Sequence, residues 1–252
     1  MWLSLISNLG IKRYNNLMNI FKSNKRIYNA TKEELIKVNL INEKMCEEIL
    51  DIQRRKIARE NLEFMQRFKI EIISIFDKEY PPALREIYSP PIFLYVKGNL
   101  KIINNKSISM VGSRDCSDYG KTIAMNLAFN LAQNGLCIVS GLARGIDEYA
   151  HLGALYANGK TIAIFGSGIN IIYPKENCYL VDKILNNNGL ILSEFPINFN
   201  PNKLSFPARN RIISGISRGL VVVEAKKKSG ALITVDFALE QGREVFAVPR
   251  KY

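Results

Sequence analysis

The chain has 252 residues, 47% hydrophobic and 23% charged, which suits a globular protein with one large domain or a large and a small one. No apolar run reaches the roughly 18 residues of a membrane span, and the apolar opening lacks a basic start and a cleavage site, so we expect a cytoplasmic protein without membrane contact. The net charge of +12 favours a polyanionic partner such as nucleic acid or an anionic membrane face, although the codon usage of an AT-rich genome would also raise the Lys content.

Cysteine and histidine usage argues against metal and redox sites. Cys46, Cys116, Cys137 and Cys178 lie far apart without a C-x-x-C pair, so we expect reduced, partly buried thiols. His151 is the single histidine, which excludes a site with several histidine ligands. The sequence therefore predicts neither a metal nor a cofactor.

Residues 1–66 are free of proline, and their apolar residues recur at helical spacing. Thr31 and Glu34 have the spacing of a capping box, in which each satisfies a backbone N–H of the other at a helix start. This pattern predicts short helices joined by tight turns, and thus a small all-helical domain over residues 1–66.

Residues 67–252 have a different pattern. In residues 67–106 four prolines interrupt the chain, which predicts short strands and turns in an extension leading into the main domain. Later, short apolar runs of the type buried on both faces alternate with helix-length segments, at 107–111, 136–140, 161–165, 190–193, 220–225 and 244–248. The predicted fold is α/β, with a doubly wound, mostly parallel Rossmann-like sheet over 107–252.

Polar loops follow these predicted strands. In such sheets ligands bind beyond the carboxyl ends of the strands, where glycine, hydroxyl groups, helix amino ends and arginine forks suit a phosphate. The loops begin at Gly112, Gly141, Gly166, Ser193 and Lys226, and the candidate phosphate ligands among them are Gly112, Ser113, Arg114, Gly141, Arg144, Gly145, Gly166, Ser167, Gly168, Arg209 and Arg211. The alternative is that the glycines only make strand-to-helix turns.

Two motifs and one residue pair could instead suggest nucleotide binding or catalysis. "GSGINI" from Gly166 has two of the three glycines of the dinucleotide fingerprint, and "GALYANGKT" from Gly153 has five residues where a P-loop has four and precedes a strand. Neither indicates a nucleotide-hydrolysing enzyme. Asp147 and His151 are one helical turn apart and would suit acid–base chemistry, but no nucleophile accompanies them, so we expect a structural hydrogen bond between the two.

The stretch "FPARNRIISGIS" places Arg209, Asn210 and Arg211 side by side. On a helix start, residues two apart point in different directions. We therefore expect one arginine to face the phosphate pocket and the other to meet the sheet or an acidic partner such as Glu194 or Glu224.

The ordered motifs "GSR", "SGLARGID", "GKTIAIFGSGI", "LSEFP", "FPARNRIISGIS" and "ALEQGREVFAVP" resemble the DNA-processing protein A family (DprA, also called Smf) over nearly the whole chain. The resemblance implies a Rossmann-like homodimer that binds single-stranded DNA without sequence specificity, is not an enzyme, and helps to load the RecA recombinase on incoming DNA in natural transformation. Residues 1–66 would be a domain similar to SAM or helix-hairpin-helix domains.

By the same resemblance, the phosphate pocket consists of Gly112, Ser113, Arg114 and the loop from Gly141 to Gly145. Lys203, Phe206, Arg209, Asn210 and Arg211 would lie on the DNA path just before a helix. The helix from about 231 to 241 and the strand near 245–248 would form the dimer contact.

The sequence departs from the family pattern at its end. Arg250 follows Pro249 where the family has glycine, and the winged-helix domain of many members is absent, by expectation, after Tyr252. Two alternatives remain open. One is a small-ligand sensor that uses the phosphate pocket. The other is a hydrolase of nucleoside monophosphates, although the "KKKSGALIT" region lacks that family's double glycine.

Overall fold

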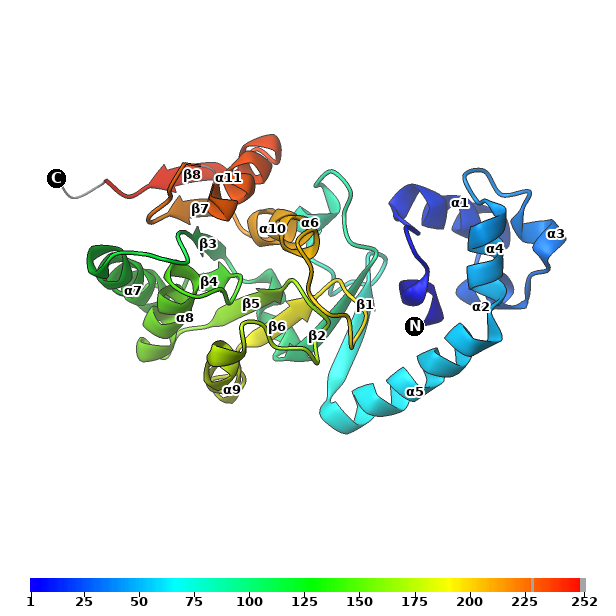
Figure 1. Ribbon diagram of the computed structural model, residues 1–252, viewed down its shortest axis with the longest axis horizontal. Coiled ribbons are helices and arrows are strands. Elements are labelled where there is room, and N and C mark those ends of the chain that lie inside the picture. Colours follow the sequence, from blue (N-terminus) through cyan, green and yellow to red (C-terminus); the bar gives the residue numbers. More distant parts are fainter. Residues whose placement is uncertain (228, 250–252) are drawn as a thin grey trace.

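The computed structural model of the chain describes residues 1–227 and 229–249 (Figure 1). Lys228, part of the loop expected from Lys226, and Arg250 at the departure from the family pattern lie outside the described residues. Within the described residues, no helix is long and apolar enough to cross a membrane.

The N-terminal part consists of helices (Figure 1), and its buried apolar residues form one cluster with residues on one face of the sheet. The capping box of Thr31 and Glu34 is confirmed, with Thr31 Oγ1 accepting from the Glu34 N–H and a Glu34 carboxylate oxygen accepting from the Thr31 N–H. The elements are the 3₁₀ turn η1 (Trp2–Leu5) and helices α1 (Ile11–Phe21), α2 (Asn24–Asn29), α3 (Lys32–Leu35), α4 (Glu43–Leu50) and α5 (Ile52–Phe68).

The predicted α/β fold is confirmed as one eight-stranded sheet of order β1-β2-β6-β5-β4-β3-β7-β8. Each predicted run lies on a strand, and the six run parallel to one another: β3 (Ser107–Val111), β4 (Cys137–Ser140), β5 (Thr161–Phe165), β6 (Leu190–Ser193), β7 (Gly219–Val222) and β8 (Glu244–Ala247). The 67–106 segment adds β1 (Ile70–Ser74) and β2 (Phe93–Gly98), which extend the sheet antiparallel from β6.

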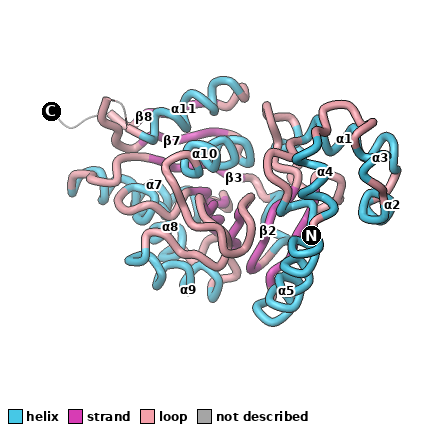
Figure 2. Tube along the Cα trace, turned by 45° about the vertical axis from the view of Figure 1, so that its right-hand side comes forward, coloured by secondary structure: helices cyan, strands magenta, loops and turns pink. Residues whose placement is uncertain are grey.

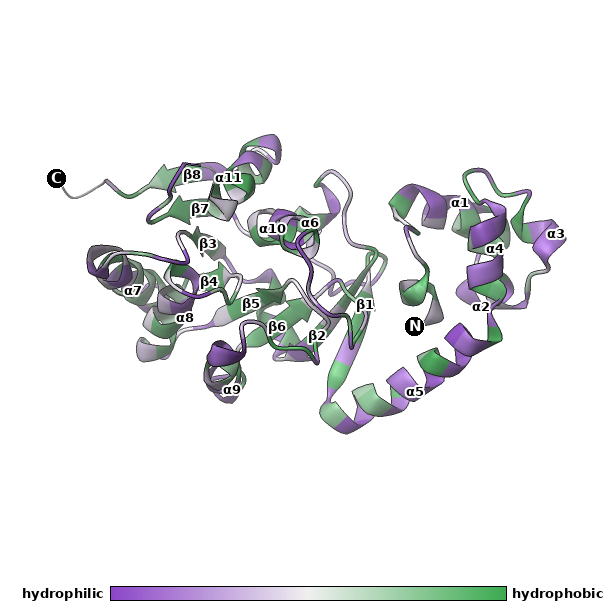
Figure 3. Ribbon diagram, in the orientation of Figure 1, coloured by the Kyte–Doolittle hydropathy of each residue, from purple (hydrophilic) through white to green (hydrophobic). Residues whose placement is uncertain are grey.

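Helices cover both faces of the sheet (Figures 1 and 2). Helices α7 (Asp118–Gln133), α8 (Ile146–Tyr156) and α9 (Cys178–Asn186) pack on one face, where they bury residues such as Met110, Ile138 and Phe165. Helices α6 (Pro82–Arg85), α10 (Ser205–Ile216) and α11 (Gly230–Glu240) cover the other, which carries Val139 and Ile164. Successive residues of a strand point to opposite faces of the sheet, and here helices cover both faces. The strands must therefore be apolar almost throughout, and Figure 3 shows them so.

Strand order reverses between β3 and β7. From β3 the chain builds β4, β5 and β6 outward on one side, and it then returns to place β7 and β8 on the other. Loops that follow strands on the two sides of such a reversal diverge and leave a crevice at the carboxyl ends of the strands. The fold therefore places its crevice beside the loops after Val111 and Val222.

Candidate functional site

A pocket with a volume of about 700 Å³ lies at this reversal. Its walls come from the loop after β3, the start of α10, and the segment from Lys226 into α11. Five basic and two acidic side chains line it: Arg114, Lys203, Arg209, Lys226, Lys227, Asp115 and Asp147. A smaller cavity of about 380 Å³ adjoins it and shares Arg114, Tyr173, Phe206 and Arg209.

Arg114 is the arginine best placed to hold an anion. Its side chain is exposed, makes no hydrogen bond or ion pair with other described residues, and lies 5.3 Å from the centre of the Phe206 ring. Gly112 and Ser113 precede it in the pocket wall, and Ser113 is buried. Gly145, at φ +75°, packs its Cα against the Ser113 and Arg114 carbonyls, where a Cβ would collide with backbone. The tight turn directs the Arg114 fork toward the open pocket.

Lysines add flexible charge around this fork. Lys203 lies just before α10, while Lys226 and Lys227 follow β7, and all three side chains are exposed. Lys226 Nζ lies 3.9 Å from an Asp115 carboxylate oxygen, both at the surface, so this pair is weak. The lysines after β7 were not assigned to the site from the sequence, although the loop was.

Two aromatic rings form one wall. Phe206 is half-buried on the first turn of α10, and its ring centre lies 5.4 Å from that of Tyr173, which is 48% exposed. A Cβ on Gly166 would collide with the Phe206 ring, so the glycine lets the ring sit down on the end of β5. Tyr173 was missed by the sequence analysis, because a single aromatic in an irregular loop carries no periodic signal.

Arg209 forms the floor of the pocket rather than its rim. The side chain is 4% exposed, donates through Nη1 to the carbonyl oxygens of Gly141 (2.5 Å) and Ile164, and donates through Nε to Asn210 Oδ1 (3.1 Å). Burial lowers the pKa of Arg209 to about 10, and the Asp147 carboxylate limits that drop, so the guanidinium is charged at neutral pH. Most of its donors are already used, so it acts on an anion mainly through its field.

Asp147 compensates this buried charge. It is 6% exposed, and a single carboxylate oxygen accepts from the Gly141 N–H (3.1 Å) and the Ala143 N–H (3.4 Å). Burial raises the pKa of Asp147, and the charge of Arg209 opposes that rise. The loop from Gly141 to Gly145 is therefore held from inside by a carboxylate.

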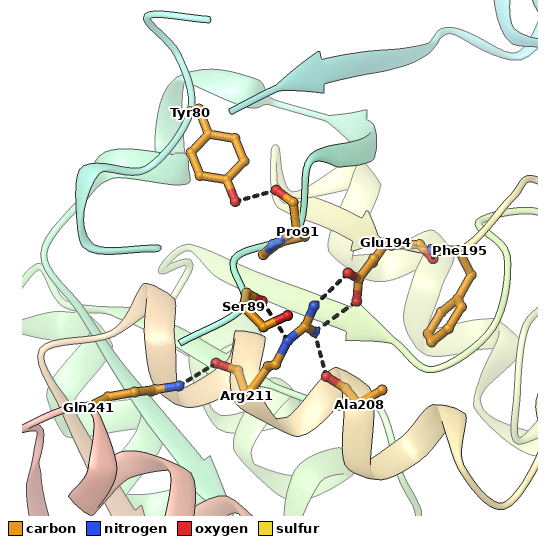
Figure 4. Close-up of polar contacts among 9 residues, drawn as sticks. Tyr80, Ser89, Pro91, Glu194, Phe195, Ala208, Arg211 and Gln241 are labelled. Carbon is orange, nitrogen blue, oxygen red and sulfur yellow. Dashed lines mark hydrogen bonds and ion pairs between the residues drawn. The ribbon is translucent and has the colours of Figure 1, made fainter. Parts of the chain in front are cut away.

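Arg211 does not line this pocket but another one, and Figure 4 shows its guanidinium facing Glu194. Its guanidinium makes a two-bond contact with the Glu194 carboxylate (2.7 and 2.5 Å) and also donates to the Ser89 and Ala208 carbonyls. The expected pairing of one arginine with Glu194 is thus confirmed for Arg211. The expected placement before a helix holds for Lys203 but is wrong for Phe206 and the two arginines, because α10 begins at Ser205 and contains them, with Pro207 tolerated in its first turn.

The remaining predicted ligands have internal partners. Arg144 forms an exposed ion pair with Glu176 at 2.5 Å beside the smaller cavity. Asn210 lines the pocket, but its side-chain amide donates to the Gly230 carbonyl (3.2 Å). Gly166, Ser167 and Gly168 lie outside the pocket lining: the Ser167 hydroxyl donates to the Ile171 carbonyl (2.5 Å), and the Gly168 N–H donates to the Phe199 carbonyl (2.8 Å).

A second carboxylate closes the amino end of α7. Glu224 accepts from the Ser117 hydroxyl (2.7 Å) and backbone N–H (3.1 Å), and a Cβ on Gly120 would collide with it. Dinucleotide-binding members of this fold class place the pyrophosphate at the amino end of the helix that follows the first parallel strand. In this chain the Glu224 carboxylate occupies that position.

The expected hydrogen bond between Asp147 and His151 is wrong. Asp147 is used by the 141–143 amides, and His151 Nδ1 instead contacts Thr161 Oγ1 at 2.7 Å on β5. Because that hydroxyl donates to the Ile138 carbonyl (2.8 Å), it accepts from a protonated Nδ1, which leaves Nε2 buried without a partner. His151 is therefore a neutral core residue.

Burial lowers the pKa of His151 to about 3, which makes stability depend on pH. The unfolded chain takes up this proton near pH 6.5, so the stability contributed by the neutral ring is complete above that pH and is lost as pH falls toward 3. We expect the free energy of unfolding, measured with urea, to fall by about 1.4 kcal/mol per pH unit more in the parent than in His151→Gln between pH 5.5 and 4. Equal pH slopes for the two proteins would contradict this account.

Together these groups offer an anion one unengaged arginine fork, three mobile lysines and an aromatic wall. They suit a phosphate next to a flat ring better than an isolated metal, and the described residues contain no group of three or more His, Cys, Asp or Glu side chains placed to hold a metal ion. Asp147 and His151, two of the buried groups whose pKa is shifted, are fixed by internal hydrogen bonds.

The model of one protein family matches residues 71–252, and its description is DNA recombination-mediator protein A. Among curated proteins, the DNA processing protein DprA of Streptococcus pneumoniae is 43% identical over 234 residues, which cover 87% of this chain and 82% of that protein. DprA of Bacillus subtilis is 46% identical over 71% of this chain and 61% of its own length. The chain spans about half (52%) of Protein Smf of Escherichia coli, at 43% identity.

Solved structures give the same result. The crystal structure of DNA processing protein A from S. pneumoniae superposes with a TM-score of 0.84 at 37% identity and covers 98% of this chain and 85% of that one. DNA processing protein A from Helicobacter pylori, described for its single-stranded DNA binding mode, superposes with a TM-score of 0.67 at 32% identity over 73% of this chain and 82% of its own.

Proposed function

The chain belongs to the DNA recombination-mediator protein A family, and we propose from this that it binds single-stranded DNA without sequence specificity through the pocket of Arg114 and Phe206. The observation that carries the proposal is the unengaged Arg114 fork next to an aromatic wall. When the Arg114 guanidinium binds a phosphate, the base of that nucleotide lies close enough to Phe206 and Tyr173 to stack on them, and any base can do so. The single-stranded DNA binding described for the H. pylori relative supports it.

The wider role follows the family. A protein that coats incoming single strands in the cytoplasm can pass them to a RecA-type recombinase, and we propose this loading step in natural transformation as its role. Binding rather than catalysis fits the site, because Asp147, the buried carboxylate of its lining, is held by internal hydrogen bonds, and the single histidine lies in the core outside the lining. A nucleotide sensor or nucleoside-monophosphate hydrolase is less well supported, since Glu224 lies at the helix end where nucleotide phosphates bind in related folds.

The test is a titration of a single-stranded oligonucleotide and of its duplex, in two base compositions, followed by fluorescence anisotropy. We expect tighter binding of the single strand and similar affinities for the two compositions, because paired bases cannot reach the aromatic wall while a phosphate contact is independent of sequence. Each base stack is typically worth about 1–3 kcal/mol. Equal affinity for the duplex would contradict the proposal, and release of free base from nucleoside monophosphates would favour the hydrolase.

We also propose a homodimer through β8 and α11. Among the described residues, β8 is the edge strand of the sheet and no strand pairs with its outer side. Phe246 on β8 and Leu239 on α11 are 52% and 61% exposed. An open edge strand with exposed apolar side chains suits a self-complementary contact with a second copy.

The dimer is expected to dissociate when a charge is placed in this contact. Light scattering of the parent should give twice the chain mass of 28.6 kDa, and Phe246→Asp should give the mass of one chain. Phe76→Asp is the control, since Phe76 is a similarly exposed phenylalanine (58%) outside β8 and α11. A parent that is monomeric at micromolar concentration would contradict the proposal.

A further inference from the structure

A second pocket, of about 610 Å³, lies on the opposite side of α10 from the DNA site. Its walls are the N-terminal segment from Leu3 to Gly10, the loop before β2 from Tyr88 to Phe93, the residues after β6, and the facing ends of α10 and α11. Figure 4 shows its polar side, where Ser89, Glu194 and Arg211 meet. It therefore lies between the helical N-terminal part and the sheet, apart from the phosphate-binding residues.

Most of its lining is apolar. Leu3, Ile6, Leu9 and Ile92 are buried around it, and the aromatic side chains that line it include Phe93, Phe195 and Phe237, which are half-buried. Tyr88, at the rim, is 87% exposed. The half-buried aromatic side chains and Tyr88 are thus the apolar groups that the pocket leaves open to solvent among the residues named here.

Its polar groups are mainly acceptors. The Arg211 guanidinium is engaged by Glu194 and by two carbonyls, so it has little capacity for an anion. Glu240 is exposed and forms no ion pair with other described residues. Gln241 donates through Nε2 to the Arg211 carbonyl (3.0 Å), while its Oε1 is buried without a donor. A ligand here must supply donors and positive charge.

We propose that this second pocket binds a peptide segment of a partner protein in which a Lys or Arg is flanked by aliphatic or aromatic residues. The cation would pair with the exposed Glu240 carboxylate, and the flanking side chains would cover Phe195 and Phe237. The charge of the lining excludes the alternative of a second DNA contact: Glu194 and Glu240 outnumber the single Arg211, in a chain whose net charge is +12. The apolar lining favours a peptide over a polyamine.

The proposal is independent of DNA binding, but both pockets share two walls. Phe206, Arg209 and Asn210 of α10 face the first, and Ala208 and Arg211 face the second. Helix α11 likewise contributes Thr234 to the first and Phe237 to the second. A partner held in the second pocket would therefore sit beside the bound strand without competing for its contacts.

The test uses fluorescein-labelled, end-blocked heptapeptides with a central Arg or Lys and all combinations of Leu, Phe and Tyr on either side, each with a matched peptide that has Glu in the centre. Anisotropy with the full chain should show binding for several Arg or Lys peptides and at least tenfold weaker binding for their Glu matches. Glu240→Lys should weaken the best peptide at least tenfold, whereas Glu60→Lys, the same charge change at an exposed site on α5, should not.

Three results would overturn the proposal: no Arg or Lys peptide that exceeds its Glu match, unchanged peptide affinity in Glu240→Lys, or displacement by spermidine at the same concentration as by unlabelled peptide, which would indicate a polyamine site. Single-stranded DNA affinity is measured on the same samples. Retained DNA binding shows that the variant is folded, and loss of DNA binding in the parent would count against the proposed function alone.

Discussion

Arg114→Ala is expected to weaken single-stranded DNA binding by about tenfold to a hundredfold. Its guanidinium is exposed in the pocket and has no partner among the other described residues, so the substitution removes a charge-assisted contact to a phosphate and leaves no buried group unpaired. Hydrogen bonds to charged groups are typically worth about 1.5–3 kcal/mol, which corresponds to this range. The loss should be the same for every base sequence, because a phosphate contact carries no sequence information.

Lys203→Ala is the matched comparison. Lys203 is exposed before α10 and acts as a solvated point charge, so its loss should weaken binding less and lower the dependence of log affinity on log salt by about 0.7, one phosphate's share for single strands. Both variants should keep the melting temperature of the parent. If Arg114→Ala binds like Lys203→Ala or better, Arg114 is not the principal phosphate ligand.

Arg211→Ala is expected to destabilise the fold by about 3 kcal/mol, the loss typical of breaking a buried ion pair. Arg211 and Glu194 are 12% and 25% exposed, and the guanidinium also joins the Ser89 loop to α10, so its removal leaves a largely buried carboxylate without its cation and takes a donor from the Ser89 carbonyl. For a chain of this length the melting temperature should fall by about 6–12 °C, measured by calorimetry. DNA affinity at a temperature where the variant is folded should be unchanged.

Arg144→Ala tests whether burial determines how much an ion pair contributes to stability. Its pair with Glu176 has the same shortest N···O distance, 2.5 Å, as the pair of Arg211, but both of its side chains are 61% exposed. An exposed pair contributes at most about 1 kcal/mol, so the melting temperature should change little. Equal destabilisation by the two substitutions would show that burial does not determine the strength of the Arg211 contact.

The strands were predictable because each is a short apolar run bounded by turn residues, and that signal is local. The pairing of β2 with β6 was not predictable, since nothing within either segment specifies its neighbour. In the site, too, local signals were predictable and tertiary contacts were not. The sequence correctly predicted that Arg114, Lys203 and Phe206 lie at one edge of the sheet, because the ends of the strands fix the positions of the loops.

What sequence could not decide is which arginine is free. Arg209 is held by Gly141, 68 residues away, and Arg144 by Glu176, 32 residues away, and neither partner is marked by spacing. Ser167 is removed from the pocket by its hydrogen bond to Ile171. Tertiary neighbours determine whether a polar side chain is available to a ligand, and only the folded chain shows them.

Glu224 at the start of α7 has a consequence for how a polymer moves through the site. Backbone amides at a helix end hold a phosphate in one fixed geometry, which suits a cofactor that stays in place. With that position closed, the anion must be held by side chains, and three of those in the pocket are lysines on flexible stems. Successive phosphates of a strand are chemically identical, so these ammonium groups can follow the strand as it advances by one nucleotide. For the proposed function, the carboxylate therefore favours a strand that can shift in the site over a ligand held in one place.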